Sequence, residues 1–210
     1  MGGCNSLPHS NLLKNKNKLT KKTKTMACNL TAGRNEPCKD SVGGIASVFF
    51  LNYTGSLGLV SSGSNSDALL ESLPAGLTVY QYDLKGNSSY TETVNSSRDN
   101  GTTFFSQELV LNLKKLTNEM TTQLKLMAYG RPQIFIHTMA GDTLLVGQRE
   151  GADVTAGTIQ TGAALGDLYG YSVTFTGQEQ FPAPFVSGST FGNPFGSISN
   201  PPTIVVGTNS

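Results

Sequence analysis

The sequence predicts a mainly β fold, a β-sandwich or partial barrel with one packed α-helix. Short segments that alternate apolar and polar residues recur along the chain, separated by turns rich in Gly, Asn and Pro. Charged residues make up 14% of the chain, against roughly 25% in typical globular domains, and Gly, Ser, Thr and Asn take their place. Such a composition is typical of β proteins that bury much of their surface in neighbours, and also of secreted adhesive domains.

The chain is expected to contain four segments. Residues 1–25 form a basic leader that is either disordered or lies upstream of the natural start at Met26. Residues 26–44 are polar and turn-rich, which predicts an extended N-terminal arm. Residues 45–186 form the β domain, and residues 187–210 form a flexible or partner-dependent tail rich in Gly, Ser and Pro.

The net charge of +1 hides an asymmetry between the leader and the rest of the chain. Residues 1–25 carry six lysines and no acidic residue, which leaves nine basic and 14 acidic residues in the remainder. A body with a net charge of −5 does not attract nucleic acid over long range. The balance therefore argues against a protein that reads DNA sequence.

The leader also fits a second pattern. Residues Met1 to Ser6 match the N-myristoylation motif, with Cys4 as a second acylation site and the lysines behind it. The motif is short and matters only in a eukaryotic cell, so we expect no membrane partner. No apolar run approaches the roughly 20 residues that span a bilayer.

Cysteine usage indicates plain thiols. The chain has three cysteines, and Cys28 and Cys38 are close enough in sequence for a disulfide. The odd count and the lack of a recognisable secretory signal favour free thiols.

The expected strands and their turns follow from the alternation. Residues 54–68 are read as a loop, residues 67–73 as a short helical turn, and Asp99-Asn100-Gly101 as a strong hairpin turn. The three strands from 77 to 113 are expected to form one antiparallel meander. Residues 151–161, rich in Gly, Ala and Thr, are expected to be extended. The predicted strands are 45–53, 77–85, 88–97, 102–113, 133–138, 143–149, 169–179 and a short one at 203–206.

One helix is predicted, over residues 114–129. Its apolar residues recur at three- and four-residue spacing and form a single stripe, and Gly130 and Pro132 end it. Such a stripe is typical of a helix packed on a sheet. The stripe consists of Leu113, Leu116, Met120, Leu124 and Met127.

The sequence contains no recognisable constellation for catalysis, cofactor binding or metal binding. His9 and His137 lack nearby partners in the sequence, and a lone histidine in a strand is more often packed than catalytic. There is no Gly-x-Ser-x-Gly elbow and no phosphate-binding Gly-Lys-Ser/Thr loop. We therefore expect no enzyme, no cofactor and no metal.

The order of arm, strand, loop, long meander, helix, hairpin, Gly-rich segment and final strand resembles the tail tube proteins of long-tailed bacteriophages, which are similar in fold to type VI secretion tube proteins. The resemblance covers about residues 27–186. The opening residues 27–33 and 38–44 also look like the start of structural proteins in phages of Bacteroidetes hosts. The other segments that carry the resemblance are 77–97, 102–113, 114–129 and 169–184.

The resemblance implies a structural virion protein with itself and other tail proteins as partners. In such tubes, subunits form rings, usually of six, whose sheets join edge to edge around a channel that passes the genome without sequence-specific contacts. The protein would be assembled in the host bacterial cytoplasm and reside in the phage tail. With the helix on the outer face, the residues expected to line the channel are Thr91, Thr93, Asn95, Ser106 and Glu108.

Two other classes of function stay open at this point. One is another virion component, such as a head–tail connector ring or a capsid decoration protein. The other is a carbohydrate-binding β-sandwich, for which Tyr80, Tyr82 and Tyr90 are the candidate aromatic contacts.

Overall fold

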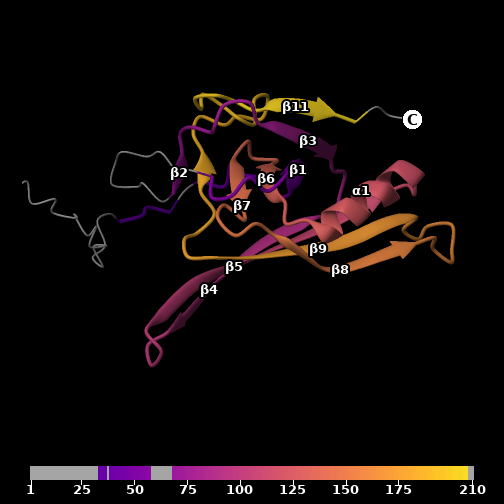
Figure 1. The fold of residues 1–210 in the computed structure, drawn as a ribbon, viewed down its shortest axis with the longest axis horizontal. Helices are drawn as coiled ribbons and strands as arrows, with labels where there is room; N and C mark the ends of the chain where they lie inside the picture. Colours follow the sequence, from indigo (N-terminus) through magenta and orange to yellow (C-terminus); the bar gives the residue numbers. More distant parts are fainter. Residues whose placement is uncertain (1–32, 37, 58–67, 208–210) are drawn as a thin grey trace, which may run out of the picture. The chain divides into compact units, whose positions relative to one another are not determined.

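The computed structural model describes residues 33–36, 38–57 and 68–207, and the residues from Lys39 onward belong to one compact unit. In its described part this unit contains two β-sheets and one α-helix (Figure 1). The predicted mainly β fold with one helix is therefore confirmed. The predictions for the leader, for Cys4 and for Cys28 concern residues outside the described ranges.

The two sheets have seven and four strands, in the orders β11-β3-β1-β6-β7-β10-β2 and β4-β5-β9-β8. The seven-stranded sheet consists of β1 (Ile45–Leu51), β2 (Leu69–Leu70), β3 (Thr78–Asp83), β6 (Gln133–Thr138), β7 (Thr143–Val146), β10 (Phe185–Val186) and β11 (Thr203–Val206). The four-stranded sheet consists of β4 (Ser89–Ser97), β5 (Thr102–Lys114), β8 (Asp153–Gln160) and β9 (Gly170–Glu179), and the helix is α1 (Asn118–Tyr129).

A first hydrophobic core fills the space between the two sheets. From the seven-stranded sheet it takes alternate residues of β1, including Val48 and Phe50, and from the four-stranded sheet it takes Leu109, Val173 and Phe175. The ring centroids of Phe50 and Phe175 lie 5.4 Å apart across this core. The predicted alternation of 169–179 is thus confirmed, because its odd-numbered residues from 171 to 175 are buried.

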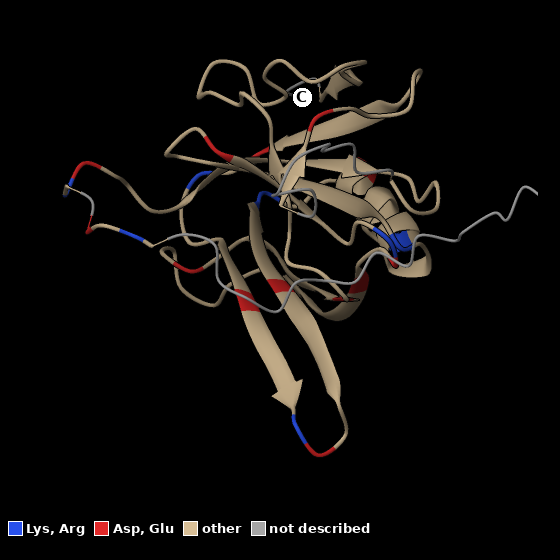
Figure 2. Ribbon diagram, turned by 90° about the vertical axis from the view of Figure 1, so that its left-hand side faces the viewer, with Lys and Arg blue, Asp and Glu red and all other residues tan. Residues whose placement is uncertain are grey.

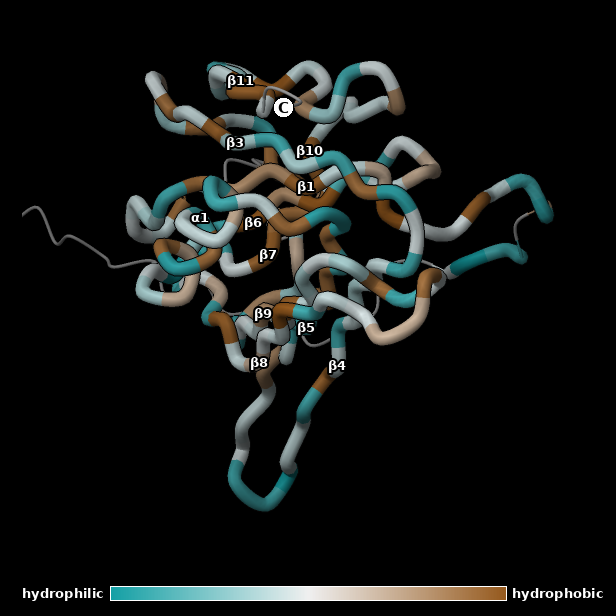
Figure 3. The backbone as a smooth tube through the Cα atoms, turned by 90° about the vertical axis from the view of Figure 1, so that its right-hand side faces the viewer, coloured by the Kyte–Doolittle hydropathy of each residue, from teal (hydrophilic) through white to brown (hydrophobic). Residues whose placement is uncertain are grey.

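A second core lies on the opposite face of the seven-stranded sheet. The other set of β1 residues, Phe49 and Leu51, packs there with Phe135 and Leu145. β1 is therefore buried on both faces, as its continuous apolar sequence predicts. The hydrophobic positions of β1, β6 and β7 stand out in the middle of the unit (Figure 3).

The meander predicted for residues 77–113 is wrong. β3 pairs with β1, with Phe50 opposite Tyr80, whereas β4 pairs with β5 in the other sheet. The chain changes sheets at Lys85 to Ser88, where Gly86 has a φ of 98° that favours glycine. Leu84 is buried in the core between the sheets just before this crossing, which fixes the end of β3 there. The 88–97 and 102–113 hairpin itself is confirmed.

The helix begins later than predicted. β5 extends to Lys114, Lys115 adopts a φ of 70°, and Thr117 caps α1 by accepting a hydrogen bond from the amide of Met120 at 3.1 Å. The apolar periodicity of the sequence does not reveal this cap. Leu113 and Leu116 lie before the helix, yet they pack on the same core as the helical residues and so extend the apolar pattern past the cap. The stripe packs against the first core as expected, but its helical members are only half-buried.

The C-terminal segment is folded, so the predicted flexible tail is wrong for residues 187–207. Phe195 and Ile198 are buried in the second core, and Phe195 contacts the rings of Phe49 and Phe135 edge-on at 5.2 and 5.1 Å. The short strand at 203–206 is confirmed as β11, which pairs in parallel with β3. The domain consequently continues past residue 186.

The predicted helical turn at 67–73 is also wrong in its described part. Leu69 and Leu70 form β2, which pairs in parallel with β10, and Ser72 bridges to Ser199. Leu70 and Leu73 are buried in the second core. The described parts of the predicted arm, 33–36 and 38–44, contain neither helix nor strand.

Candidate functional site: the polar face of the four-stranded sheet

The five residues expected to line a channel lie on one face of the four-stranded sheet. Thr91 stands opposite Glu108 and Thr93 opposite Ser106, while Asn95 faces Phe104. Residues paired across an antiparallel ladder project to the same side. Their neighbours Leu109 and Leu111 enter the core, so the five residues occupy the face that points away from it.

The same face continues across β9 and β8 with residues that the sequence analysis did not single out. Glu108 is opposite Thr176 of β9, and Thr176 is in turn opposite Asp153 of β8. The hydroxyls of Thr155 and Thr176 lie 2.9 Å apart on this face. The alternation of residues 170–178 marks the polar side of β9, but the place of β9 and β8 beside β5 follows only from the strand order. The added polar residues are Ser172, Thr174, Thr176, Gln178, Asp153, Thr158 and Gln160.

We refer to this surface as the polar face. Its apolar members are Val110, Ala156 and Phe104, and among the other positions hydroxyl, amide and carboxylate groups prevail. Charged residues are sparse across both sheets (Figure 2). Glu108 and Asp153 are its acidic members, and Lys114 stands at the far end of β5. The face is therefore hydrophilic with little charge.

Both edges of this sheet are unpaired within the described chain. β4 pairs only with β5, and β8 pairs only with β9. Seven of the eight residues of β8 are exposed, and Ile159 has 56% of its surface exposed. An exposed strand edge is a template for another strand, so both sides of the polar face are open to pairing with a further chain.

Hydrogen bonds around the buried Gln107 side chain fix the middle of the β4–β5 hairpin to the rest of the unit. The Gln107 side chain is buried, donates to the Glu92 carboxylate at 3.0 Å and accepts from the amide of Gly147 at 2.9 Å. The same Glu92 oxygen accepts from the amide of Ala183 at 3.0 Å. These contacts hold β4 and β5 in a defined position relative to the β7–β8 turn.

Beyond this point the hairpin is a bare two-stranded ribbon. β9 pairs with β5 only from Phe105 onward, so residues 95–104 have no third strand beside them. The ribbon extends away from the sheets and ends in a hydrophilic turn (Figures 1 and 3). Val94 at its base and Phe104 within it expose 61% and 38% of their surface.

A basic hollow lies at the other end of β4 and β5. Two adjoining hollows of about 300 and 410 Å³ share Asn87, Lys114 and Leu168, and Lys85 lines the smaller one. The Asn112 side chain, at its wall, bonds to the carbonyl of Asn87. Asp167 borders the larger one. Two backbone amides hold the pKa of its carboxyl below the usual value.

His137 serves packing. Its Nε2 lies 3.3 Å from the carbonyl oxygen of Phe191, which only accepts, so the neutral ring carries its proton there and Nδ1 accepts from the Thr143 hydroxyl at 2.9 Å. Burial lowers the pKa of His137, and the Phe191 carbonyl and Asp142 oppose that shift. The ring is buried and joins the β6–β7 hairpin to the C-terminal segment.

The three tyrosines considered for carbohydrate binding do not form an exposed platform. Tyr82 and Tyr90 pack against the first core, and burial raises the pKa of both hydroxyls. Tyr80 is 43% exposed and lies with Tyr82 on β3 of the seven-stranded sheet, whereas Tyr90 lies on β4 of the four-stranded sheet.

In the described part of the chain, no three His, Cys, Asp or Glu side chains gather as metal ligands. None of the helical residues described is part of a segment long and apolar enough to cross a bilayer. Cys38 is exposed, and the pairing of Cys28 stays a prediction because that residue lies outside the described ranges.

Comparison with known proteins adds no relative. The chain matches no family model, no curated protein and no solved structure.

Proposed function

We propose that this chain is a structural subunit of a phage tail tube, which assembles into rings around a channel lined by the polar face. The observation that carries the proposal is that a hydrophilic, weakly charged sheet face is flanked on both sides by unpaired edge strands, β4 and β8. Its partners are further copies of itself and other tail proteins. Its location is the virion tail, after assembly in the bacterial cytoplasm.

Ring closure explains how the two edges are satisfied. When β4 of one copy pairs with β8 of the next, the four-stranded sheets continue into one barrel, and a closed barrel has no exposed edge. The exposed backbone of β8 and the exposed Ile159 are then covered by the neighbour. Residues paired across strands project to the same side of a sheet, so the polar faces of all copies lie on the same side of the barrel wall.

The position of the helix supports a polar face that points to the inside of the ring. α1 packs on the core side of the four-stranded sheet, through Met120, Leu124 and Met127. The second sheet lies on that side as well. In a ring, more space is available at a larger radius, so the helix and the second sheet fit best on the outer side. The polar face of the four-stranded sheet then faces the channel.

The chemistry of the polar face suits a channel that passes DNA without holding it. Glu108 and Asp153 repel phosphate, and the hydroxyl side chains between them offer no fixed positive charge. DNA is bound mainly through Lys and Arg contacts to phosphate, and on this face Lys114 is the basic member, at the end of β5.

Negative-stain electron microscopy of the full chain at increasing concentration tests the proposal. We expect rings or stacked rings with a stain-filled centre. A chain that remains monomeric at every concentration, also after addition of tail-initiating proteins, contradicts it.

A further inference from the structure

The tip of the ribbon carries one charge of each sign. Arg98 and Asp99 are adjacent in the turn between β4 and β5, and both are exposed. They appear as a basic and an acidic position side by side at the end of the hairpin (Figure 2). Because residues 95–104 have no third strand, the tip stands clear of the rest of the unit.

The hollow at the other end of the same strands carries the complementary charges. Lys85 and Lys114 line it, and Asp167 lies at its border. Within the described ranges neither lysine has an ion-pair partner. The ammonium of Lys114 lies over Gly86, 4.0 Å from the position where a Cβ would sit. Two ammonium groups beside one hollow repel each other unless an anion joins them.

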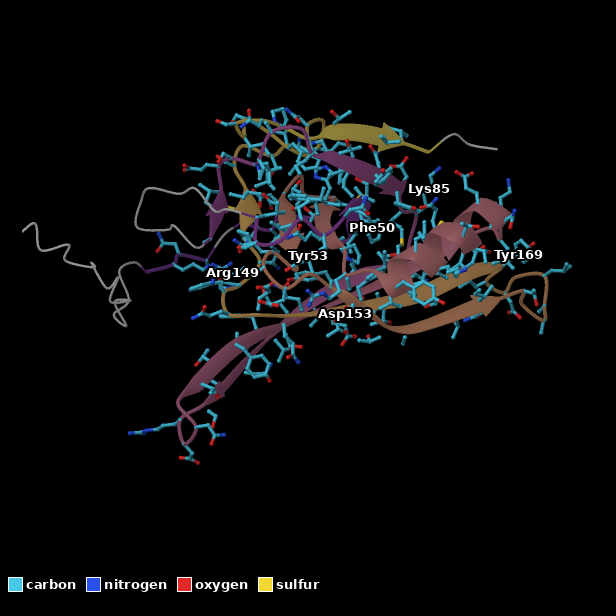
Figure 4. All side chains as sticks on the ribbon, in the orientation of Figure 1. Phe50, Tyr53, Lys85, Arg149, Asp153 and Tyr169 are labelled. Carbon is cyan, nitrogen blue, oxygen red and sulfur yellow. The ribbon has the colours of Figure 1, made fainter. Side chains whose placement is uncertain are left out.

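β5 connects the two places directly. It begins at Thr102, next to the tip, and ends at Lys114 in the hollow. Lys85 and Tyr169, which line the two adjoining hollows, lie at the end of the unit remote from the hairpin tip (Figure 4). A second copy displaced along β5 therefore meets the hollow of the first copy with its own tip.

We propose that the basic hollow binds the hairpin tip of a second copy of this chain, with Asp99 placed between Lys85 and Lys114, and Arg98 beside Asp167. The inference rests on the proposed function, because a tube needs a contact that repeats along its axis. The contact is head-to-tail and leaves one free tip and one free hollow at the ends of a stack, so it propagates without closing.

The length of β5 sets the repeat of such a stack. Lys114 lies 15 residues beyond Asp99, and 15 residues of extended chain span about 50 Å at roughly 3.3 Å per residue. This is an upper limit for the axial repeat, because strands in a barrel are tilted.

Charge reversal tests the contact with the full chain in sedimentation velocity. Asp99→Lys alone and Lys85→Glu/Lys114→Glu together are each expected to weaken self-association at least about tenfold, since each turns attraction into repulsion. Mixing the two variants restores association, because each tip then meets a hollow of opposite charge. The triple variant in one chain restores it as well.

Matched reversals elsewhere on the surface serve as controls. Glu150→Lys and Lys125→Glu change the same charges at exposed positions away from the tip and the hollow, and self-association should change less than twofold. Equal melting temperatures of all variants exclude loss of the fold. The proposal is overturned if the reversed variants associate like wild type, if the mixture behaves like its components, or if wild type does not associate at all.

A short duplex DNA separates this contact from a phosphate site. If the wild-type chain binds the duplex, Lys85→Glu/Lys114→Glu abolishes this DNA binding, and Asp99→Lys leaves self-association of the chain unchanged, then the hollow binds phosphate and the docking proposal fails. Electron microscopy separates the outcome from the proposed function. If rings form and stack equally well with and without the charge reversals, the proposed tube function is retained and this contact is rejected. If mixing the reversed variants restores head-to-tail association but no rings form, the contact is supported and the tube function is contradicted.

Discussion

Gln107 of β5 lies directly opposite Glu92 of β4, and its side-chain amide donates a hydrogen bond to the Glu92 carboxylate at 3.0 Å. The pair sits where the three-stranded part of the sheet gives way to the bare ribbon. Through Gly147 and Ala183 it connects the hairpin to two loops of the unit. The direction in which the ribbon extends thus depends on a buried polar contact.

Replacing Gln107 by Leu should lower the free energy of unfolding by about 2 kcal/mol, because the buried amide of Gly147 loses its acceptor. Urea denaturation measures the change. Gln178→Leu, at an exposed position of β9, is the matched control and should stay within about 0.5 kcal/mol. Equal effects of the two substitutions would show that the buried contact contributes nothing.

The C-terminal segment should prove essential for stability. Phe195→Ala removes a ring that is 2% exposed and contacts two other rings, so we expect a loss of about 3–5 kcal/mol. Phe191→Ala, four residues earlier and 66% exposed, should cost less than about 1 kcal/mol. If Phe195→Ala were as mild as Phe191→Ala in thermal or urea unfolding, the segment would not be part of the core.

Stability should fall as the pH drops below about 6.5, the ordinary pKa of histidine. The folded state holds the pKa of His137 below that value, so the unfolded state binds the proton first and gains free energy from it. The loss continues until the pH passes the lowered pKa of the folded state, at a rate of at most about 1.4 kcal/mol per pH unit.

Urea denaturation between pH 7.5 and 5 measures this effect. His137→Gln, which does not titrate, should be less stable at neutral pH but should lack this part of the pH dependence. A variant whose stability falls with pH as steeply as that of wild type would rule out His137 as the source.

Thr117 should define the start of the helix. Thr117→Ala removes the acceptor for the Met120 amide and should cost about 1 kcal/mol, while Thr117→Ser keeps it. Thr122→Ala, inside α1, is the control, since its hydroxyl bonds only to a carbonyl already within the helix. Thermal unfolding followed by circular dichroism compares the stability of the three variants with that of wild type. A Thr117→Ala variant as stable as wild type would contradict the assignment of the cap.

Local patterns in the sequence predicted the elements better than their partners. The alternation of residues 170–179 gave both the strand and its buried side, and the Asp99-Asn100-Gly101 turn gave the β4–β5 hairpin. The pairing of β3 with β1 and β11 depends on contacts far apart in the chain, which no local period encodes. The packing of Phe195 could not be predicted either, because it also depends on residues far away in the chain. The Gly, Ser and Pro residues around Phe195 are typical of loops, whether or not these pack on a core.

The candidate site divides in the same way. The five predicted polar residues share a face because they alternate along two strands joined by a recognisable turn. The contributions of β8 and β9 follow only from the strand order, and the hollow between Lys85 and Lys114 follows only from the change of sheet at Gly86. Sequence reasoning therefore reached the residues of one hairpin and not the surface that they complete.

The central claim is that the polar face lines a channel in the assembled protein, and labelling of an introduced cysteine tests it most directly. Thr93→Cys on the polar face and Lys125→Cys on α1 are compared in a chain whose native cysteines are serine, using a maleimide on a bulky polyethylene glycol. Assembled rings should shield residue 93 from this reagent and leave residue 125 accessible, whereas the unassembled chain should react at both positions. Rapid labelling of residue 93 in intact rings, at the rate seen before assembly, would contradict the account.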